Sequence, residues 1–378
     1  GNFVFERVQV GFTGMGFGIT ASSWHGLSEL PDQDNLLCAF SLRSIVAGYG
    51  NCISVTDSTY TANWIIGFDQ NGNVNKETIQ DFADAHGISD VYLKQWWDQT
   101  GNTRHAKYGD SGAYIDGGRL PIKGPRIMKD GAFCESAGRT SLYFDGYSSD
   151  PKNDSYEFGS QFALPISSGE SEPDAWLPLV TFLTGVVFTP EEGDPGRTYY
   201  NLFDGDYSYS GYSDRRNGFR LEMRQLDGAG TPCYLRGEWT RERELDTTRA
   251  DSNSVYSSVP LQWSTPYYAF HSLTKKTPGG TVVEDIHSVY LNSIQYPHEI
   301  EFYNTSIQYN GDYSNDLVNL GTDWATYNSG GIWTTKSQGA FRGHMQEFFL
   351  YKDAEEVYLG DIQDYIDKFY DIATSVDK

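Results

Sequence analysis

The stretch VYLKQWWDQTGNTRHA, residues 91–106, decides how this chain is read, because it fits either a buried strand or a ligand-binding loop. Its first residues follow the pattern of a β-strand, in which successive side chains face opposite surfaces of a sheet. One of Trp96 and Trp97 therefore points inward, and most buried aromatic side chains belong to a core. The tryptophan pair indicates a strand rather than a sugar-binding platform.

The second half of the stretch has the composition of a turn. Asp98 and Asn102 are suited to bonding turn amides, and Gly101 accepts the positive φ angle that tight turns require. Together with Gln99, these residues form a signature of the fold, and we assign no ligand to them. His105 is interpreted as a turn or surface residue.

Aromatic residues and glycine are abundant in the 378-residue chain, which contains 27 Tyr, 21 Phe, 9 Trp and 40 Gly. Aromatic side chains suit pleated, half-buried surfaces, and glycine suits tight turns. A hydrophobic fraction of 38% is enough to fill a core. The composition therefore predicts an all-β protein with many turns, built as one large domain or two ordinary ones.

The formal net charge of −23 argues against several classes of partner. Nucleic acid and anionic membranes would both be repelled, so we expect no nucleic-acid partner. No apolar run is long enough to span a bilayer, so no membrane insertion is expected. The four cysteines contain no C-x-x-C pair, which argues against a zinc cluster, and they allow three disulfide connectivities.

Three segments have the apolar spacing of helices. The first covers residues 35–50 and ends at glycines. The second covers residues 75–87, with Asn75 as its N-cap and Gly87 as its C-cap. The third, residues 360–373, is an amphipathic helix that we expect to dock on the body of the protein.

The rest of the chain is predicted to consist of strands and loops. The run LVTFLTGVVF, residues 179–188, is continuously apolar, as expected of a central strand. Residues 1–34 are interpreted as an N-terminal arm or lead-in, and residues 35–378 as one domain. Two polar regions, near 147–175 and 191–217, are interpreted as insertions in that domain.

Five motifs occur in an order and spacing that match a known family. They are AFSLR (39–43), IGFDQNGNVNKETIQDF (66–82), WWDQTGNTRHA (96–106), GPRI (124–127) and LYFDG (142–146). With them the chain resembles the catalytic domain of α-L-arabinofuranosidase B, glycoside hydrolase family 54. It resembles even more closely the copies of that domain in bacteriophage and other virion proteins. The last motif adds Phe144, Asp145 and Gly146 to the fold signature.

The resemblance covers residues 36–146 well, and residues 339–353 look like the penultimate strand of such domains. It implies an all-β, concanavalin A-like jelly-roll sandwich with a few peripheral helices. The concave face of such a sandwich often holds sugars.

The catalytic motifs of the family are missing from this chain. A retaining glycosidase needs two carboxylates, about 5–5.5 Å apart, as nucleophile and acid/base. In the family the nucleophile follows a strand that contains two adjacent cysteines. The acid/base lies in a Gly-Gly-Asp-Asn run. This chain has no adjacent cysteines, and Ile332 and Trp333 follow its late Gly-Gly pair. The carboxylates that could substitute are Asp145, Glu191, Glu192, Asp204, Asp206, Glu222 and Glu238.

A Tyr-rich loop is the candidate contact with a glycan, because tyrosine rings stack on sugar C–H faces and also occur at interfaces. The candidate residues are Tyr199, Tyr200, Tyr207, Tyr209 and Tyr212. The alternative is a loop folded on its own aromatic rings. We predict no cofactor or metal site, and the acidic run 204–214 offers a place only for incidental calcium.

The resemblance and the missing motifs lead us to expect a non-enzymatic, virion-associated structural protein of a phage tail, fibre, baseplate or capsid decoration. Its lectin-like domain would bind host-surface polysaccharide. Its partners would be other virion proteins and copies of itself, at a virion surface or another extracellular location. One alternative is a glycoside hydrolase that acts on surface polysaccharide. Another is a purely structural virion module without a ligand.

Overall fold

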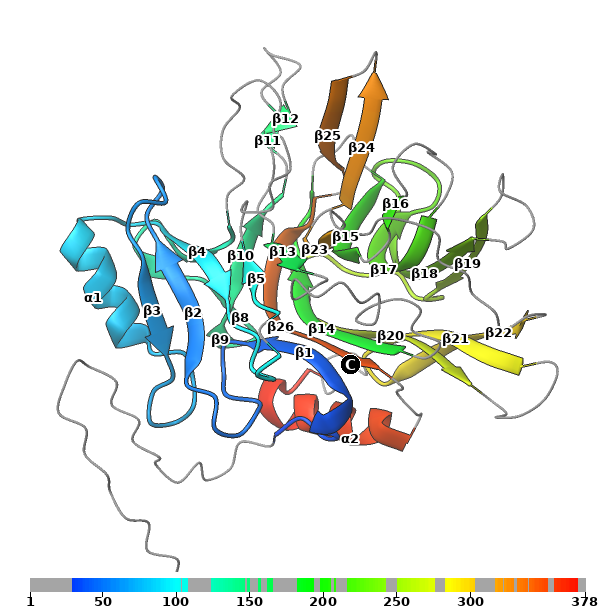
Figure 1. Cartoon of the computed structure of the whole chain (residues 1–378), viewed down its shortest axis with the longest axis horizontal. Helices are drawn as coiled ribbons and strands as arrows, with labels where there is room; N and C mark the ends of the chain where they lie inside the picture. The colour runs from blue at the N-terminus through cyan, green and yellow to red at the C-terminus, as the bar shows by residue number, and fades with distance from the viewer. Residues whose placement is uncertain are drawn as a thin grey trace, which may run out of the picture.

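In its described part, the computed structural model shows an all-β sandwich with one α-helix beside the strands at one end and another below the sheets (Figure 1). The described residues are 29–102, 104–107, 124–146, 148–149, 156–157, 162–165, 182–193, 198–204, 207–208, 216–242, 250–275, 283–302, 317–321, 323–329, 332–338, 340–352 and 357–372. The all-β class and the sandwich predicted from the sequence are confirmed. Neither helix in this part of the chain combines the length and the apolarity that a membrane crossing requires.

The first sheet is built around two long neighbouring strands, which lie antiparallel to each other. Its strands in spatial order are β22 (Ile294–Phe302), β21 (Val283–Leu291), β20 (Tyr267–Lys275), β14 (Phe182–Pro190) and β26 (Arg342–Lys352). The far side of β26 is shared by β10 (Leu142–Asp145) and β1 (Leu36–Ser41). The sequence correctly predicts β14 as a central strand.

The second sheet faces the first. Its strands in spatial order are β19 (Ala250–Tyr256), β18 (Cys233–Glu242), β17 (Arg216–Gln225), β15 (Tyr199–Asp204), β23 (Leu317–Leu320) and β13 (Phe162–Pro165). The short strand β16 (Tyr207–Ser208) pairs with the start of β17. Inward-facing side chains of the two sheets form the main core. Phe182 stacks on Phe219 with ring centroids 3.9 Å apart, and Phe203 stacks on Phe348 at 4.9 Å.

A group of strands near α1 joins the two sheets (Figure 1). These strands are β2 (Asn51–Thr56), β3 (Trp64–Gly67), β4 (Val91–Trp96), β5 (Ala106–Lys107), β6 (Arg126–Lys129) and β7 (Ala132–Phe133). β5 pairs with β13 of the second sheet, and β6 pairs with β10 of the first. Three small hairpins complete the described strands, namely β8 (Glu135–Ser136) with β9 (Arg139–Thr140), β11 (Ser148–Ser149) with β12 (Tyr156–Glu157), and β24 (Asp323–Ser329) with β25 (Ile332–Gln338).

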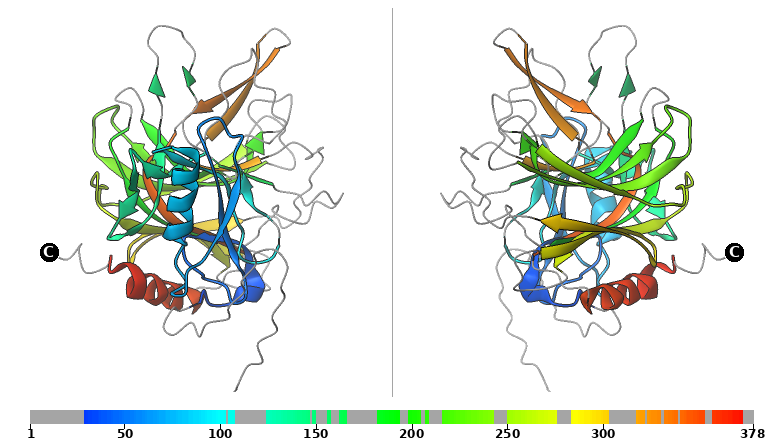
Figure 2. Two further views of the ribbon diagram at one scale, coloured as in Figure 1. Left: turned by 90° about the vertical axis from the view of Figure 1, so that its left-hand side faces the viewer. Right: turned by 90° about the vertical axis from the view of Figure 1, so that its right-hand side faces the viewer.

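Helix α2 (Val357–Tyr370) covers the outer face of the first sheet, on the side away from the second sheet (Figure 2). Its buried residues Ile362, Tyr365 and Ile366 form a second apolar cluster with residues of the sheet such as Phe349 and Tyr351. The amphipathic C-terminal helix predicted from the sequence is therefore confirmed, although it begins and ends three residues earlier than expected.

An ion pair is buried beneath this helix. Arg43 Nε lies 2.6 Å from Glu347 Oε1, and the two side chains are 2% and 0% exposed. The same carboxylate accepts hydrogen bonds from Ser41 Oγ at 3.0 Å and from Tyr370 OH at 2.9 Å. The Arg43 guanidinium also lies 4.2 Å from the centroid of the Tyr365 ring. The pair thus links the segment after β1, the centre of β26 and α2.

The helix predicted over residues 35–50 is wrong, because residues 36–41 form β1. The strand is buried on both faces, with Phe40 in the main core and Ala39 in the cluster under α2. Burial on both faces removes the two-residue alternation that identifies a strand in a sequence. The helix predicted over 75–87 is confirmed as α1 (Lys76–His86), with Asn75 and Gly87 as its caps.

Parts of the two regions interpreted as insertions belong to the second sheet. β13 lies within 147–175 and β15 within 191–217, and each pairs with β23. Of the N-terminal arm, residues 1–28 lie outside the described part. The remainder packs on the body, since Leu30 is buried and the carbonyl of Pro31 accepts a 2.7 Å hydrogen bond from Tyr351 OH.

The loop after β4 bonds the backbone around β1. Asp98 Oδ1 accepts hydrogen bonds from the amides of Ala39 (3.1 Å) and Thr100 (3.0 Å). Gln99 accepts one from the amide of Ile45 and donates two to the carbonyls of Ser41 and Arg43. Gly101 has a φ of 81°, as the turn requires.

Neighbouring residues complete this arrangement. Asn102 donates to the carbonyls of Leu36 and Leu37, and Trp96 is fully buried in the core. Trp97 lies on the other face of the strand, and its indole nitrogen donates to Ser54 Oγ at 2.9 Å. The polar side chains that follow β4 therefore hold β1 in place.

Two histidines meet inside the sandwich. His271 on β20 and His287 on β21 are fully buried, with their Nε2 atoms 2.7 Å apart. At this distance one Nε2 atom donates a hydrogen bond to the other, and the accepting ring is neutral. Burial and, secondarily, the neighbouring ring hold the pKa of His271 well below its usual value of 6.5.

This pair predicts a loss of stability in mild acid. Below about pH 6.5 the unfolded chain binds a proton at His271 that the folded chain does not bind. The free energy of unfolding is therefore expected to fall as the pH drops from about 7.5 to 5.5, with a contribution from His271 of at most about 1.4 kcal/mol per pH unit. Urea titrations across this range measure the slope.

The control for this prediction is a second histidine. His271→Gln is expected to flatten the pH dependence, whereas His86→Gln, at an exposed position of α1, is expected to leave it unchanged. Equal slopes for the wild type and His271→Gln would contradict the assignment.

Candidate functional site

The outer face of the second sheet is polar and forms the candidate site. Side chains of a strand alternate between the two faces of a sheet. On β17, Leu221 and Met223 point into the core, so Glu222 and Arg224 point away from it. On β18, Leu235 points inward, and the residues on either side of it point outward.

The strand register arranges the outward side chains in three rows across the sheet. The residues that face one another in the three rows are Tyr199, Arg224 and Tyr234; Asn201, Glu222, Arg236 and Tyr256; and Asp204, Arg220, Glu238 and Ser254. A register shift between Asn201 and Phe203 on β15 keeps both Asn201 and Asp204 in these rows. We call these eleven side chains the polar grid.

Ion pairs hold the centre of the polar grid. Arg236 Nη1 lies 2.6 Å from Glu222 Oε1, and its Nη2 lies 2.8 Å from Glu238 Oε1. Arg220 Nε lies 3.1 Å from the other oxygen of Glu238. Burial alone would lower the pKa of Arg236, but the carboxylates of Glu222 and Glu238 raise it above its usual value. Arg236 therefore stays charged and fixes both carboxylates.

Two polar groups at this centre lack hydrogen-bond partners. Among the described residues, both the nitrogen and the oxygen of the Asn201 side-chain amide are buried without a hydrogen-bond partner. Glu222 Oε2 also lacks a hydrogen bond, although Arg220 Nη1 lies 4.0 Å from it. The two residues face each other across β15 and β17, and both are 0% exposed. Buried polar groups in folded proteins are nearly always paired, and leaving one unpaired costs about 1–3 kcal/mol. These atoms therefore retain hydrogen-bonding capacity that the described residues do not use.

Half-buried tyrosines surround the centre. Tyr199, Tyr234 and Tyr256 all lie on the polar face with part of their surface accessible. The guanidinium of Arg224, whose side chain is 37% exposed, lies 5.8 Å from the Tyr199 ring centroid. The grid thus runs from an accessible row that contains aromatic rings to a buried row that contains unpaired polar atoms.

Of the carboxylates predicted as candidates, the structure brings Asp204, Glu222 and Glu238 together on the polar grid. Asp145 instead bonds Arg126, at the edge of the first sheet. Glu191 accepts a 3.0 Å hydrogen bond from Tyr143 OH and lies 3.6 Å from His344 Nε2. Glu192 is exposed, and Asp206 lies outside the described residues.

The five candidate tyrosines are not equivalent. Tyr199 belongs to the polar grid, but Tyr200 is only 4% exposed and packs into the main core against Trp263. Its ring is therefore unavailable to a glycan. The backbone of Tyr207 forms part of β16. Tyr209 and Tyr212, like most of the acidic run proposed for incidental calcium, lie outside the described residues.

Several residues of the site were missed from the sequence, namely Asn201, Arg220, Arg224, Tyr234, Arg236, Ser254 and Tyr256. The alternation in FRLEMRQ and YLRGE shows that polar side chains share one face of each strand. Which residues of β15, β17 and β18 face one another depends on long-range register, for which a single sequence offers no signal.

Within the described residues, no group of three or more His, Cys, Asp or Glu side chains could hold a metal ion. The four cysteines are buried and unpaired. Burial raises the pKa of the Cys134 and Cys233 thiols to about 12.

Comparison with known proteins gives structural matches alone. No protein-family model matches the chain, and no curated protein matches it. An arabinofuranosidase complexed with arabinofuranosyl-α-1,2-xylobiose matches with a TM-score of 0.48 and 14% identity, over 88% of this chain and 62% of that chain. A family 54 α-L-arabinofuranosidase soaked with a cyclic sulfate inhibitor matches with the same TM-score and coverage at 12% identity.

A further match is the binding domain of botulinum neurotoxin serotype C1. Its TM-score is 0.37, with 6% identity over 88% of this chain and 52% of that chain. The chain spans 62% of the length of the arabinofuranosidases that it matches. At these identities and TM-scores the matches carry no conclusion about the activity of this chain.

Proposed function

We propose that the protein binds carbohydrate on the polar grid. The observation that carries this proposal is the pair formed by Asn201 and Glu222. Among the described residues, neither atom of the Asn201 side-chain amide has a hydrogen-bond partner, and neither does Glu222 Oε2. A sugar hydroxyl both donates and accepts hydrogen bonds, as an amide and a carboxylate together require. The nearby Tyr199 and Tyr256 supply rings of the kind that stack on sugar C–H faces.

The charge of the grid favours a neutral sugar. The three arginines are balanced by three carboxylates, those of Asp204, Glu222 and Glu238. A ligand that carried its own charge would disturb this balance, whereas neutral hydroxyls can use the remaining hydrogen-bonding capacity.

Replacing Asn201 with leucine tests the proposal, because binding and stability should change in opposite directions. The variant removes two unpaired polar atoms from a buried place, so the free energy of unfolding is expected to stay level or rise by about 1 kcal/mol. Binding to a glycan array is expected to fall by about tenfold or more, because leucine cannot form a hydrogen bond with the sugar hydroxyl and leaves it unpaired.

Glu77→Gln, an exposed glutamate on α1, is the control and should change neither property. A marked loss of stability in Asn201→Leu would show that the amide has a partner in the free protein. Unchanged glycan binding by a variant of wild-type stability would contradict the proposed site.

A second candidate function is hydrolysis of a glycan. The observation that favours it is Arg236, which bonds both Glu222 and Glu238 and so places two carboxylates on either side of one guanidinium. Release of reducing sugar from a bound glycan would support this activity, and Glu238→Gln should then abolish release even when glycan is supplied in excess. Binding without release would leave a lectin-like function.

We also propose that the domain is part of a virion, together with other virion proteins and as a homo-oligomer. The support for this setting is the sequence resemblance of residues 36–146 to virion-borne domains. Mass determination of the purified protein in solution tests the oligomer.

A further inference from the structure

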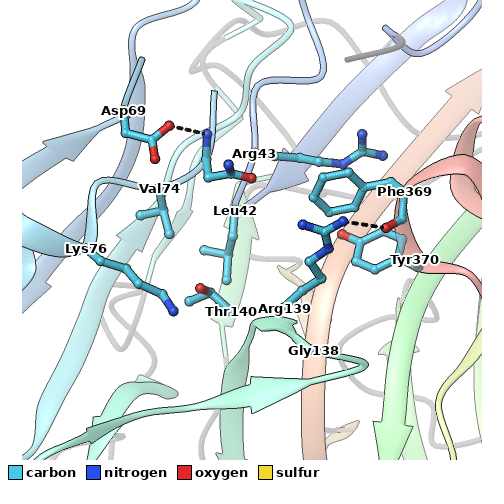
Figure 3. A pocket seen from close by; sticks show the side chains of 11 residues that line it. Leu42, Arg43, Asp69, Val74, Lys76, Gly138, Arg139, Thr140, Phe369 and Tyr370 are labelled. Atoms are coloured by element: carbon cyan, nitrogen blue, oxygen red, sulfur yellow. Dashed lines mark hydrogen bonds between the residues drawn. The ribbon is translucent and has the colours of Figure 1, made fainter. Parts of the chain in front are cut away.

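A cavity of about 230 Å³ lies apart from the polar grid, between a turn before α1, the hairpin β8–β9 and the end of α2 (Figure 3). It is large enough for roughly seven water molecules, which is the space of one small organic molecule. The residues that line it are Leu42, Arg43, Asp69, Asn73, Val74, Lys76, Gly138, Arg139, Thr140, Phe369 and Tyr370.

The lining is positively charged, although the whole chain carries a net charge of −23. Three cations, those of Arg43, Lys76 and Arg139, face one carboxylate, that of Asp69. Arg43 is neutralised by Glu347, as described above. Asp69 Oδ1 already accepts hydrogen bonds from two backbone amides of its own turn, at 2.8 and 2.9 Å.

The other two cations are available to a ligand. Lys76 Nζ pairs with Glu135 at 2.7 Å, but both side chains are half exposed, and such surface pairs contribute only about 0–1 kcal/mol. Arg139 donates to the carbonyl of Phe369 at 3.2 Å and lies 4.3 Å from its ring centroid. Among the described residues, no carboxylate lies within ion-pair distance of Arg139.

Figure 3 shows Lys76 and Arg139 approaching from opposite sides, with Leu42 and Thr140 between them. The buried side chains of Leu42 and Val74 provide an apolar surface, and Thr140 provides a hydroxyl. We propose that this cavity binds a small carboxylate with a compact ring as its body. The carboxylate would contact Arg139 and Lys76, and the ring would lie on the apolar surface.

Calorimetric titration with sodium glucuronate, at low salt, tests this proposal. Glucose is the uncharged comparison and is expected to show no binding at the cavity, because it lacks the carboxylate. Arg139→Gln is expected to weaken glucuronate binding about tenfold, since a charge-assisted hydrogen bond is lost. Binding should also weaken as salt is added.

Two further variants show whether glucuronate binds at the cavity or elsewhere on the protein. Lys368→Gln removes an exposed cation from α2, one residue before Phe369, and should leave the affinity unchanged. Glu222→Gln alters the polar grid and should likewise leave glucuronate binding unchanged. Loss of binding in Glu222→Gln but not in Arg139→Gln would overturn the proposal, and so would equal glucuronate affinities of Arg139→Gln and the wild type. A urea titration of Arg139→Gln confirms that the variant is folded.

Discussion

Replacing Arg43 with methionine is expected to lower the free energy of unfolding by about 3–5 kcal/mol, the usual effect of removing one partner of a buried ion pair. Glu347 would then be fully buried with its charge uncompensated, although Ser41 and Tyr370 would still donate hydrogen bonds to it. The shift of the urea midpoint, with the slope of the unfolding free energy held constant, measures the loss.

Two comparisons show whether the effect comes from the unpaired charge. The double variant Arg43→Met, Glu347→Met is expected to unfold at a higher urea concentration than Arg43→Met alone, because it removes both charges. Lys76→Ala breaks the exposed pair with Glu135 and should change the midpoint little. A double variant less stable than Arg43→Met would show that packing, not charge, decides the loss.

Replacing Asp98 with alanine is expected to cost about 3 kcal/mol. The fully buried carboxylate accepts hydrogen bonds from the amides of Ala39, Thr100 and Arg104, and each unpaired buried donor costs about 1–3 kcal/mol. Some of these donors are expected to reach water in the variant. The loss in the free energy of unfolding should therefore be smaller than the sum of the three separate costs. Asp98→Asn retains one accepting oxygen and should lose less.

Asp57 provides the matched control for this prediction. Its carboxylate makes the same kind of hydrogen bonds, to Thr59 and to the amide of Thr61, but it does so in an exposed turn. Asp57→Ala should therefore change the urea midpoint little, because water replaces the carboxylate. Equal losses in the two variants would contradict the role assigned to Asp98.

The features predicted correctly from the sequence are those with local causes. Helix α1 begins at an asparagine cap and ends at a glycine in the left-handed region, and both signals lie within a few residues of the helix. The stripe of Ile362, Tyr365 and Ile366 identifies α2 in the same way. The turn after β4 is likewise predicted from residues within the turn itself, Asp98 and Gly101.

The features that were missed depend on distant parts of the chain. The sequence of β1 predicts a helix because the strand does not alternate: the main core buries one of its faces and the cluster under α2 buries the other. The pairing of Asn201 with Glu222 follows from the long-range register of β15 with β17, and the pairing of Asp204 with Arg220 follows from the register shift after Asn201. Tyr200 was chosen as a glycan contact, yet the same strand directs it into the core.

The position of β26 has a consequence for the order in which the protein can fold. This strand begins at Arg342, and it lies between β14 on one side and β10 and β1 on the other. The edges of β14, β10 and β1 that face β26 therefore have no partner until β26 itself has left the ribosome. Contacts between such distant residues form slowly, and unpaired strand edges associate with other chains. The nascent protein thus depends on β26 to pair with these strand edges, which would otherwise be open to aggregation with other chains.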